Sequence, residues 1–319
     1  FRARYSADML KSLSSTMFEN LSPIERYGLV DDTWSSVMAG RTSATDFLDF
    51  ARSFQSETDL DVWTVLSGCL AGLDKLVEGE AKLQYKAAIR DLAQPALDRL
   101  GWEPSDSDSS RDLELRGLFI RLLANVGDDD LAIKNAGDLH DSYLVDAGSV
   151  EPNVAAAATG VVASKGDSAQ YEVFLDKYHN PTTPQEERRY QSALSAFSGE
   201  AEMDRTLAMS LDGTVRTQDA PYLLAVCMRN KEQGYRAWEF VKSNWDKINK
   251  DFPSNSIVRM LSGVTSLSKP EQAADVIAFF DDHEVPQGQL TLQQTLEKLR
   301  VNVALRERES GSFSDSLTS

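Results

Sequence analysis

The chain has 319 residues, of which 41% are hydrophobic and 26% are charged, and its formal net charge is −17. This composition is typical of a folded protein, and the acidic balance argues against nucleic acid and anionic membrane surfaces as partners, because phosphate groups bind where lysine and arginine are in surplus. No apolar run approaches the roughly 20 residues that span a bilayer, so we expect a soluble chain without a membrane partner.

The first five residues alternate aromatic and basic side chains and precede Ser6, a candidate helix cap. A single short strand is not stable alone, because its backbone hydrogen-bonding groups stay unpaired. We therefore interpret residues 1–5 as the remnant of the last strand of an upstream domain.

Residues 6–309 are predicted to form one helical-repeat domain. Apolar residues recur with the helical period of 3.6, and the scarcity of glycine (18) and proline (10) argues against a β-sandwich or barrel. The three clearest stripes are Trp63, Leu66, Leu70, Leu73 and Val77; Leu115, Leu118, Phe119, Leu122 and Val126; and Tyr235, Trp238, Val241, Trp245 and Ile248. The tryptophans on these stripes are expected in the core.

Helix boundaries are also marked along the chain. Ser22–Glu25 has the pattern of a capping box, and Thr183–Glu186 repeats it. Pro95 is expected to kink or break a long helix, and residues 103–112 to form a polar loop. Asp128–Asp130 has the composition of an acidic first helical turn. Glycines at which helices are expected to stop are Gly40, Gly127, Gly166, Gly199 and Gly213.

These signals predict an all-α fold of about 16 helices, at intervals resembling those of helix-pair repeats. We expect a right-handed superhelix of antiparallel helix pairs, similar to HEAT or armadillo arrays, with a concave face. A compact helical bundle is the alternative, although 16 helices would need several bundles. Residues 310–319 are rich in glycine and serine and are predicted to be a disordered tail.

Two cysteines, Cys69 and Cys227, lie within apolar helical stretches. Two such distant cysteines do not make a disulfide framework, so we expect both to be small buried hydrophobic residues in a reducing compartment. The cytoplasm is the location that this favours.

No self-contained active site is recognisable in the sequence. A catalytic zinc site usually needs two histidines one helical turn apart, whereas His140, His179 and His283 are isolated. Nucleophile-elbow, phosphate-loop and dinucleotide-binding patterns do not occur. Residues 106–112 alternate aspartates as a calcium loop does, but they lack its central glycine and terminal glutamate. We expect no catalytic and no metal-binding residue in this chain.

Several stretches together resemble the helical C-terminal domain of M1-family zinc aminopeptidases. Residues 1–5 resemble the strand that closes the family's small β-sandwich, and Leu21–Asp32 its first strong helix, with Gly40, Glu57 and Trp63 at matching spacing. Residues 294–302 look like its penultimate helix. The most similar stretch comprises Thr214–Asp219, Met228–Asn230, Gly234, Ala237, Trp238, Asn244 and Trp245.

The resemblance implies a parent enzyme that removes N-terminal amino acids from peptides with a catalytic zinc. The family's zinc helix and substrate-amine loop map onto no residue here, because neither H-E-x-x-H nor G-x-M-E-N occurs. This domain would then cap the active-site chamber, with the upstream catalytic domain and peptide substrates as partners. Arg229, Asn230 and Arg300 are the candidates to bind the C-terminal part of a peptide, because arginine suits a carboxylate.

Structural roles are the alternative for these arginines and for others in the motifs. Arg229 could instead pair with an acidic neighbour between helices, and Arg26 with Asp32 and Arg216 with Asp219 could link helices. A stand-alone α-solenoid scaffold that binds a protein partner is the alternative function, and a hydrolase with a scattered active site is a third reading.

Overall fold

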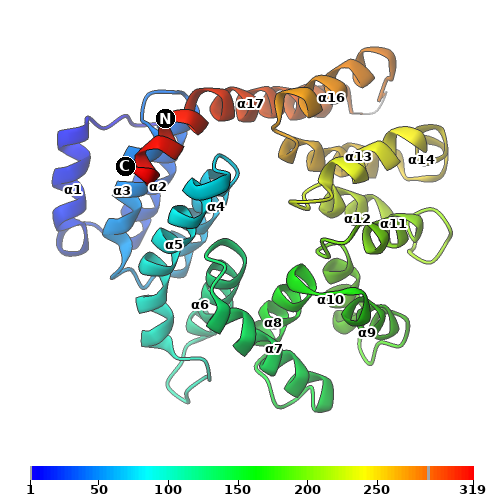
Figure 1. Ribbon diagram of the computed structural model, residues 1–319, viewed down its shortest axis with the longest axis horizontal. Coiled ribbons are helices and arrows are strands. Elements are labelled where there is room, and N and C mark those ends of the chain that lie inside the picture. The colour runs from blue at the N-terminus through cyan, green and yellow to red at the C-terminus, as the bar shows by residue number, and fades with distance from the viewer. Residues whose placement is uncertain (1, 286–287) are drawn as a thin grey trace. The chain divides into compact units, whose positions relative to one another are not determined.

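The computed structural model describes residues 2–285 and 288–319 and contains 17 α-helices and three short 3₁₀ or π segments in these ranges (Figure 1). No β-strand occurs in the same ranges. The all-α prediction is confirmed, with a helix number close to the expected one. The superhelical arrangement stays a prediction.

The chain divides into two compact units, residues 1–161 with 305–319, and residues 162–304. Helices α8 and α17 each contribute residues to both units. The first unit holds α1 (Ala7–Asn20), α2 (Pro23–Met38), α3 (Ala44–Ala51), η1 (Arg52–Phe54), α4 (Leu60–Asp74), α5 (Gly79–Leu100), α6 (Ser110–Arg121), η2 (Leu122–Val126), α7 (Asp130–Val145) and most of α8 (Pro152–Lys165).

The second unit consists of shorter helices. They are α9 (Ser168–His179), α10 (Pro184–Leu194), α11 (Glu200–Ala208), α12 (Ala220–Cys227), α13 (Gly234–Ser243), α14 (Trp245–Asp251), α15 (Ser254–Met260), η3 (Leu261–Ser266), α16 (Pro270–Asp282) and the first half of α17 (Gln289–Thr318). Helix pairs that pack closely include α2 with α4 and α5 with α6 in the first unit, and α9 with α10 and α12 with α15 in the second.

The predicted capping devices are present at the helix starts. Ser22 and Glu25 form a complete capping box at α2. Thr183 accepts a hydrogen bond from the Glu186 backbone at α10, but the Glu186 carboxylate turns to Thr182 instead. Asp129 caps α7, as the acidic first turn predicted. Each cap satisfies backbone N–H groups that have no partner within the helix.

Aromatic side chains from the predicted stripes form both cores. In the first unit Trp63 meets Phe119 edge to face, with 4.7 Å between ring centroids. In the second, Trp238 and Trp245 both pack edge to face on Phe279 of α16. All three tryptophans are buried, as predicted.

Pro95 was expected to kink or break a long helix; α5 continues through it, so the helix does not break there. Proline has no N–H to donate to the carbonyl of residue i−4, which here is Asp91. The side-chain amide of Gln55 donates to that carbonyl oxygen at 3.0 Å. A neighbouring segment therefore supplies the hydrogen bond that proline removes.

The predicted glycine stops differ in their backbone conformation. Gly40 and Gly213 adopt positive φ angles of 67° and 93°. Gly127 has a φ of −73°, and the next residue, Asp128, takes the left-handed conformation with a φ of 50°. Asp128 is paired with Lys86, which holds this turn.

Residues 1–5 were expected to be an extended strand remnant, and residues 310–319 a disordered tail. Residues 2–6 have no regular secondary structure, and Phe1 lies outside the described residues. The structure differs from the prediction of a disordered tail at 310–319, because α17 extends to Thr318. Phe313 is 1% exposed and packs against Tyr85, so a tertiary contact outweighs the local glycine and serine content.

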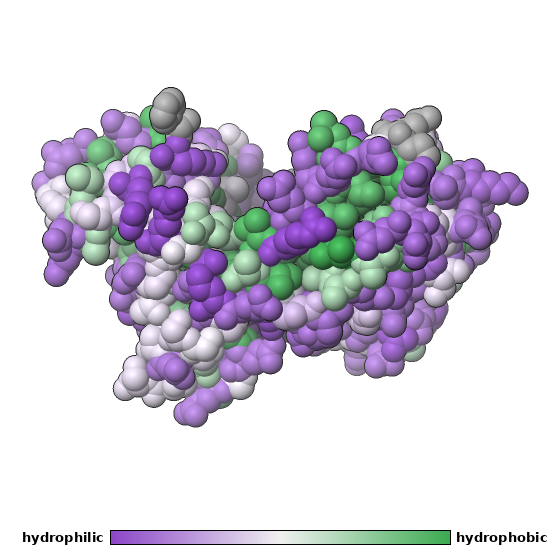
Figure 2. Space-filling view, turned by 90° about the horizontal axis from the view of Figure 1, so that it is seen from above, coloured by the Kyte–Doolittle hydropathy of each residue, from purple (hydrophilic) through white to green (hydrophobic). Residues whose placement is uncertain are grey.

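Hydrophilic residues predominate on the face drawn in Figure 2, where hydrophobic residues gather in places. Large hydrophobic side chains that reach the surface include Leu131, Val145, Leu290 and Val301. Among the described residues, no helix is both long enough and apolar enough to cross a membrane.

Candidate functional site

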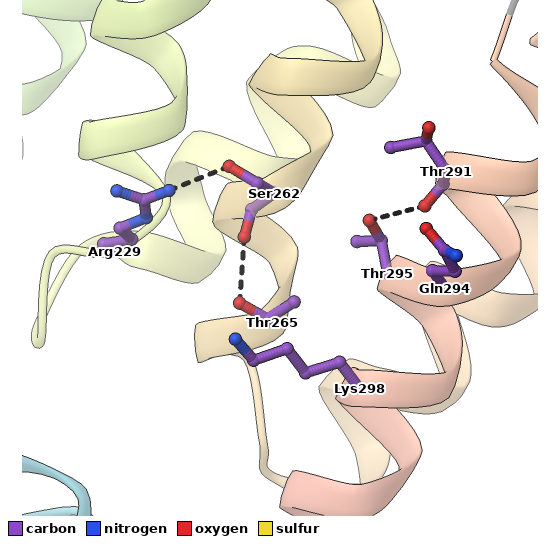
Figure 3. Close-up of a pocket in the computed structure, with 7 residues that line it drawn as sticks. All are labelled: Arg229, Ser262, Thr265, Thr291, Gln294, Thr295 and Lys298. Atoms are coloured by element: carbon purple, nitrogen blue, oxygen red, sulfur yellow. Dashed lines mark hydrogen bonds between the residues drawn. The ribbon is translucent and has the colours of Figure 1, made fainter. Parts of the chain in front are cut away.

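The second unit contains a cavity of about 350 Å³ between the end of α12, the segment η3 and helix α17 (Figure 3). This volume is at the small end of the range for pockets that bind small ligands, about 300–1,000 Å³. The residues that line it are Arg229, Ser262, Thr265, Thr291, Gln294, Thr295 and Lys298. All seven side chains carry a hydrogen-bond donor, which is a guanidinium, an ammonium, an amide or a hydroxyl group, so the wall is polar.

Arg229 stands just beyond the end of α12 and is held from η3. Its Nη2 atom donates to the Ser262 hydroxyl at 2.8 Å, and that hydroxyl donates to the Arg259 carbonyl at 2.7 Å. The close approach of η3 to α12 depends on Gly263, because a Cβ there would lie 2.6 Å from the Ala225 carbonyl oxygen. The packing of the two segments thus fixes one wall of the cavity.

Helix α17 provides the opposite wall. Thr291, Gln294, Thr295 and Lys298 are three or four residues apart, which places them on one helical face. Figure 3 shows the four side chains on the α17 side of the cavity, with Lys298 extended toward Thr265. The Asn302 amide donates to the Thr265 carbonyl at 2.8 Å and joins α17 to η3.

Some donors of the cavity wall are used by hydrogen bonds within the protein, and others remain available to a ligand. The hydroxyls of Ser262, Thr265 and Thr295 donate to backbone carbonyl oxygens. The remaining guanidinium N–H groups of Arg229 and the ammonium of Lys298 have no carboxylate partner among residues 2–285 and 288–319. Two cations and no carboxylate line the cavity, so the site suits an anion such as a carboxylate.

The structure brings one of the three predicted peptide-binding residues to this cavity. Arg229 lines it and bonds to a hydroxyl rather than to the acidic neighbour considered in the alternative reading. Asn230 does not line it. Its amide donates to the Ser195 and Phe197 carbonyls, and its oxygen accepts from the backbone of Glu232 and Gln233. Asn230 therefore shapes the turn between α12 and α13.

Arg300 is exposed on α17 and is not among the residues that line the cavity. It is two residues beyond Lys298, which is a rotation of about 200° around an α-helix. Lys298 is thus the residue that sequence reasoning missed. The helix containing it was singled out, but helical spacing alone did not show which of its basic residues faces η3.

The other residues of the predicted motifs stabilise the fold. Arg26 binds Glu57 through two hydrogen bonds of 2.6 and 2.9 Å, not Asp32 as expected, and the Trp63 indole donates to the Glu57 carbonyl. Arg216 bonds to Glu187 at 2.8 Å and lies 4.0 Å from Asp219.

Asp275 of α16 links a second group of motif residues. It accepts hydrogen bonds from Trp238 at 2.7 Å, from Lys242 and from Tyr235. Burial raises the pKa of the Asp275 carboxyl, but the hydrogen bonds from Lys242 and Trp238 outweigh it, so the pKa lies below its ordinary value. This ionised carboxylate holds α13 against α16.

Within the described parts of the chain, no group of three or more His, Cys, Asp or Glu side chains is close enough to hold a metal ion. His140 is buried in α7, His179 is exposed, and the His283 ring stacks on Phe279 with its Nδ1 atom 2.8 Å from the Phe279 carbonyl.

Comparison with known proteins decides the family. Residues 1–301 match the family described as "ERAP1-like C-terminal domain". The chain belongs to this family. Among individual relatives, "Aminopeptidase M1" of Arabidopsis thaliana is 29% identical over 317 residues, which is 95% of this chain and 35% of that protein.

Two further relatives have similar coverage. "Aminopeptidase M1-B" of Oryza sativa subsp. japonica is 26% identical, covering 95% of the chain and 35% of the relative. "Endoplasmic reticulum aminopeptidase 2" of Homo sapiens is 26% identical, covering 90% and 31%. This ERAP1-like domain therefore spans about a third of the length of the relatives that it matches, and its sequence is consistent with the C-terminal domain of an M1 aminopeptidase.

Proposed function

We propose that this ERAP1-like domain serves a zinc aminopeptidase by binding the C-terminal carboxylate of a peptide whose N-terminus is cleaved elsewhere in the enzyme. The catalytic domain of the same protein and peptide substrates are then its partners, and the zinc belongs to that catalytic domain. The domain caps the chamber in which peptides are held and does not itself catalyse.

The observation that carries this proposal is the cavity with Arg229 and Lys298 on facing walls and no carboxylate lining it. In a chain with a net charge of −17, such a cavity is a local exception. A peptide carboxylate offers two acceptor oxygens, which suit the guanidinium fork and the ammonium group. Gln294 and Thr291 could bond to the last peptide group.

The binding step is tested on the 319-residue chain with acetyl-Ala-Ala-Leu, prepared as the free acid and as the amide. We expect the acid to bind and the amide to bind at least about fivefold more weakly, measured by NMR titration. Arg229→Ala and Lys298→Ala should each weaken the acid by about two- to fivefold, the range for exposed charge pairs. Arg300→Ala removes a charge from the same helix outside the cavity and is the matched control.

Equal binding of acid and amide, or an equal effect of Arg300→Ala, contradicts the assignment. In the enzyme that includes the catalytic domain, Arg229→Ala should raise KM for longer peptides and leave hydrolysis of leucine p-nitroanilide unchanged. If KM and length preference stay the same, Arg229 does not position substrate.

The absence of catalysis is a separate part of the proposal. The purified 319-residue chain, assayed with added zinc and leucine p-nitroanilide, should show no turnover while unfolding cooperatively. Stoichiometric zinc together with turnover would refute it.

The stand-alone scaffold is not favoured, because the relatives of this domain are aminopeptidases over nearly the whole chain. A reducing compartment such as the cytoplasm also belongs to the proposal. It is supported by Cys69 and Cys227, which are both free and buried.

A further inference from the structure

A second cavity, of about 320 Å³, lies in the first unit between the α5–α6 loop and one face of α7. Its chemistry is opposite to that of the carboxylate site. Six residues line it, none of them basic: Trp102, Glu103, Asn135, Asp138, Leu139 and Ser142. The proposal that follows does not depend on the proposed function, because the two cavities share no residue.

The α5–α6 loop is anchored by a buried cation. Arg116 of α6 is 0% exposed and donates to the Leu100 and Gly101 carbonyls at 2.9 Å and to the Asp108 carboxylate at 2.6 Å. These contacts hold the loop on both sides of Trp102 and Glu103. The two residues are therefore presented by a fixed loop, at little further cost in conformational entropy on binding.

Asp108 is held in its ionised form. The Ser105 backbone N–H and the Arg116 guanidinium both donate to it, and together they keep the pKa of the Asp108 carboxyl below its ordinary value. Gly101 turns the chain out of α5 with a φ of 71°. The anchoring of the loop thus persists at neutral pH.

Helix α7 contributes four residues with the spacing of a single face: Asn135, Asp138, Leu139 and Ser142. The same face carries Leu131 near its start and Val145 at its end, which are 59% and 90% exposed. The opposite face, with Ala132, Ala136, His140 and Tyr143, is buried. Exposed apolar side chains thus flank the polar cavity at both ends.

The two carboxylates of the cavity remain accessible. Glu103 makes no hydrogen bond or ion pair with any described residue. Asp138 pairs with Lys134 at 2.6 Å, but both side chains are about two-thirds exposed and four residues apart on the helix. Such a pair contributes about 0–1 kcal/mol, so an incoming cation can compete for Asp138.

We propose that this cavity binds an arginine side chain of a partner protein, with the guanidinium against the Trp102 ring and bonded to Glu103 and Asp138. A guanidinium stacks on an indole face and matches carboxylates with its planar fork. Apolar residues beside the arginine would cover Leu131 and Val145. The negative charge of the cavity and its aromatic wall select this partner over an acidic or a purely apolar one.

The test uses the 319-residue chain and two blocked tripeptides, acetyl-Ala-Arg-Ala-amide and its citrulline counterpart, which is neutral and nearly isosteric. Neither has a carboxylate, so neither reports on the Arg229 cavity. Binding is followed by the NMR resonance of the Trp102 indole N–H, assigned with Trp102→Phe. We expect a saturable shift with the arginine peptide and binding at least about threefold weaker with citrulline.

Variants distinguish binding in the cavity from nonspecific attraction of the peptide to an acidic surface. Glu103→Gln and Asp138→Asn should each weaken the arginine peptide by about two- to fivefold. Asp141→Asn removes the same charge from an exposed position of α7 outside the cavity and should leave binding unchanged. No saturable shift at Trp102, equal binding of citrulline, or an equal effect of Asp141→Asn would overturn the proposal.

Discussion

The Glu57 carboxylate is fully buried and is satisfied by Arg26 and by two backbone N–H groups. The hydrogen bond from Arg26 and the charge of Glu57 raise the pKa of the Arg26 guanidinium. Each group therefore depends on the other for the solvation that it lost on folding.

Glu57→Gln should lower the free energy of unfolding by about 3–5 kcal/mol, because it leaves the buried Arg26 without a counter-charge. Urea denaturation measures this loss. Glu172→Gln breaks an ion pair with Arg205 in which both side chains are exposed, and should cost less than about 1 kcal/mol. Similar losses for the two variants would contradict the structural role of Glu57.

The two thiols are expected to be unreactive in the folded chain. Burial raises the pKa of Cys69 and of Cys227 to about 12, and the thiolate is the reactive form. At pH 8 dithiobis(nitrobenzoate) should therefore detect no thiol in the folded protein and two per chain in urea. Rapid reaction of either cysteine without denaturant would show that its surroundings open readily.

At the scale of single elements, α5 shows how a neighbour compensates for proline. Pro95→Ala should stabilise the chain by up to about 3 kcal/mol, because the new N–H completes the bond to the Asp91 carbonyl. Gln55→Ala should cost about 1 kcal/mol by removing the present donor.

The two changes are expected to be coupled. In the Pro95→Ala background the Asp91 carbonyl keeps a donor, so Gln55→Ala should cost less than it does alone. Urea unfolding of the two single variants and the double variant gives the coupling energy. Strict additivity would mean that Gln55 does not replace the hydrogen bond lost at Pro95.

Most helices could be predicted because their signals are local. The stripe through Trp63 and the capping box at Ser22 depend on residues a few positions apart, and both were confirmed. The helix break expected at Pro95 and the disorder expected at residues 310–319 are absent for a common reason. In each case a distant partner, Gln55 or Tyr85, supplies what the local sequence lacks.

At the scale of the whole molecule, the candidate site was only partly predictable for the same reason. Arg229 was found because it lies within a recognisable motif, but Lys298 is 69 residues further along the chain and reaches the cavity only through the packing of α17 on η3. Much of the motif itself proved to be structural, as Trp238 and its partner Asp275 show. Family resemblance therefore identified the domain more readily than its binding residues.

Helix α17 contributes to both units, and its last part completes the first. Glu309 accepts the Ala44 N–H at the start of α3, and Arg308 donates to the Val37 carbonyl. Phe313 is buried against Tyr85 of α5. The second unit has its own core, built in part from the rings of Phe174, Tyr190 and Phe197.

Phe313→Ala should therefore destabilise the first unit selectively. A buried phenylalanine replaced by alanine costs about 3–5 kcal/mol, because the contacts are lost and a cavity remains. Hydrogen exchange followed by mass spectrometry should become faster in α3 and α5 and stay unchanged in α9 and α10. Phe18→Ala, at a ring that is 41% exposed, is the control and should have a smaller effect. Equal acceleration in both units would mean that they unfold as one cooperative body, whereas no acceleration in either would mean that the Phe313 side chain contributes little to the first unit.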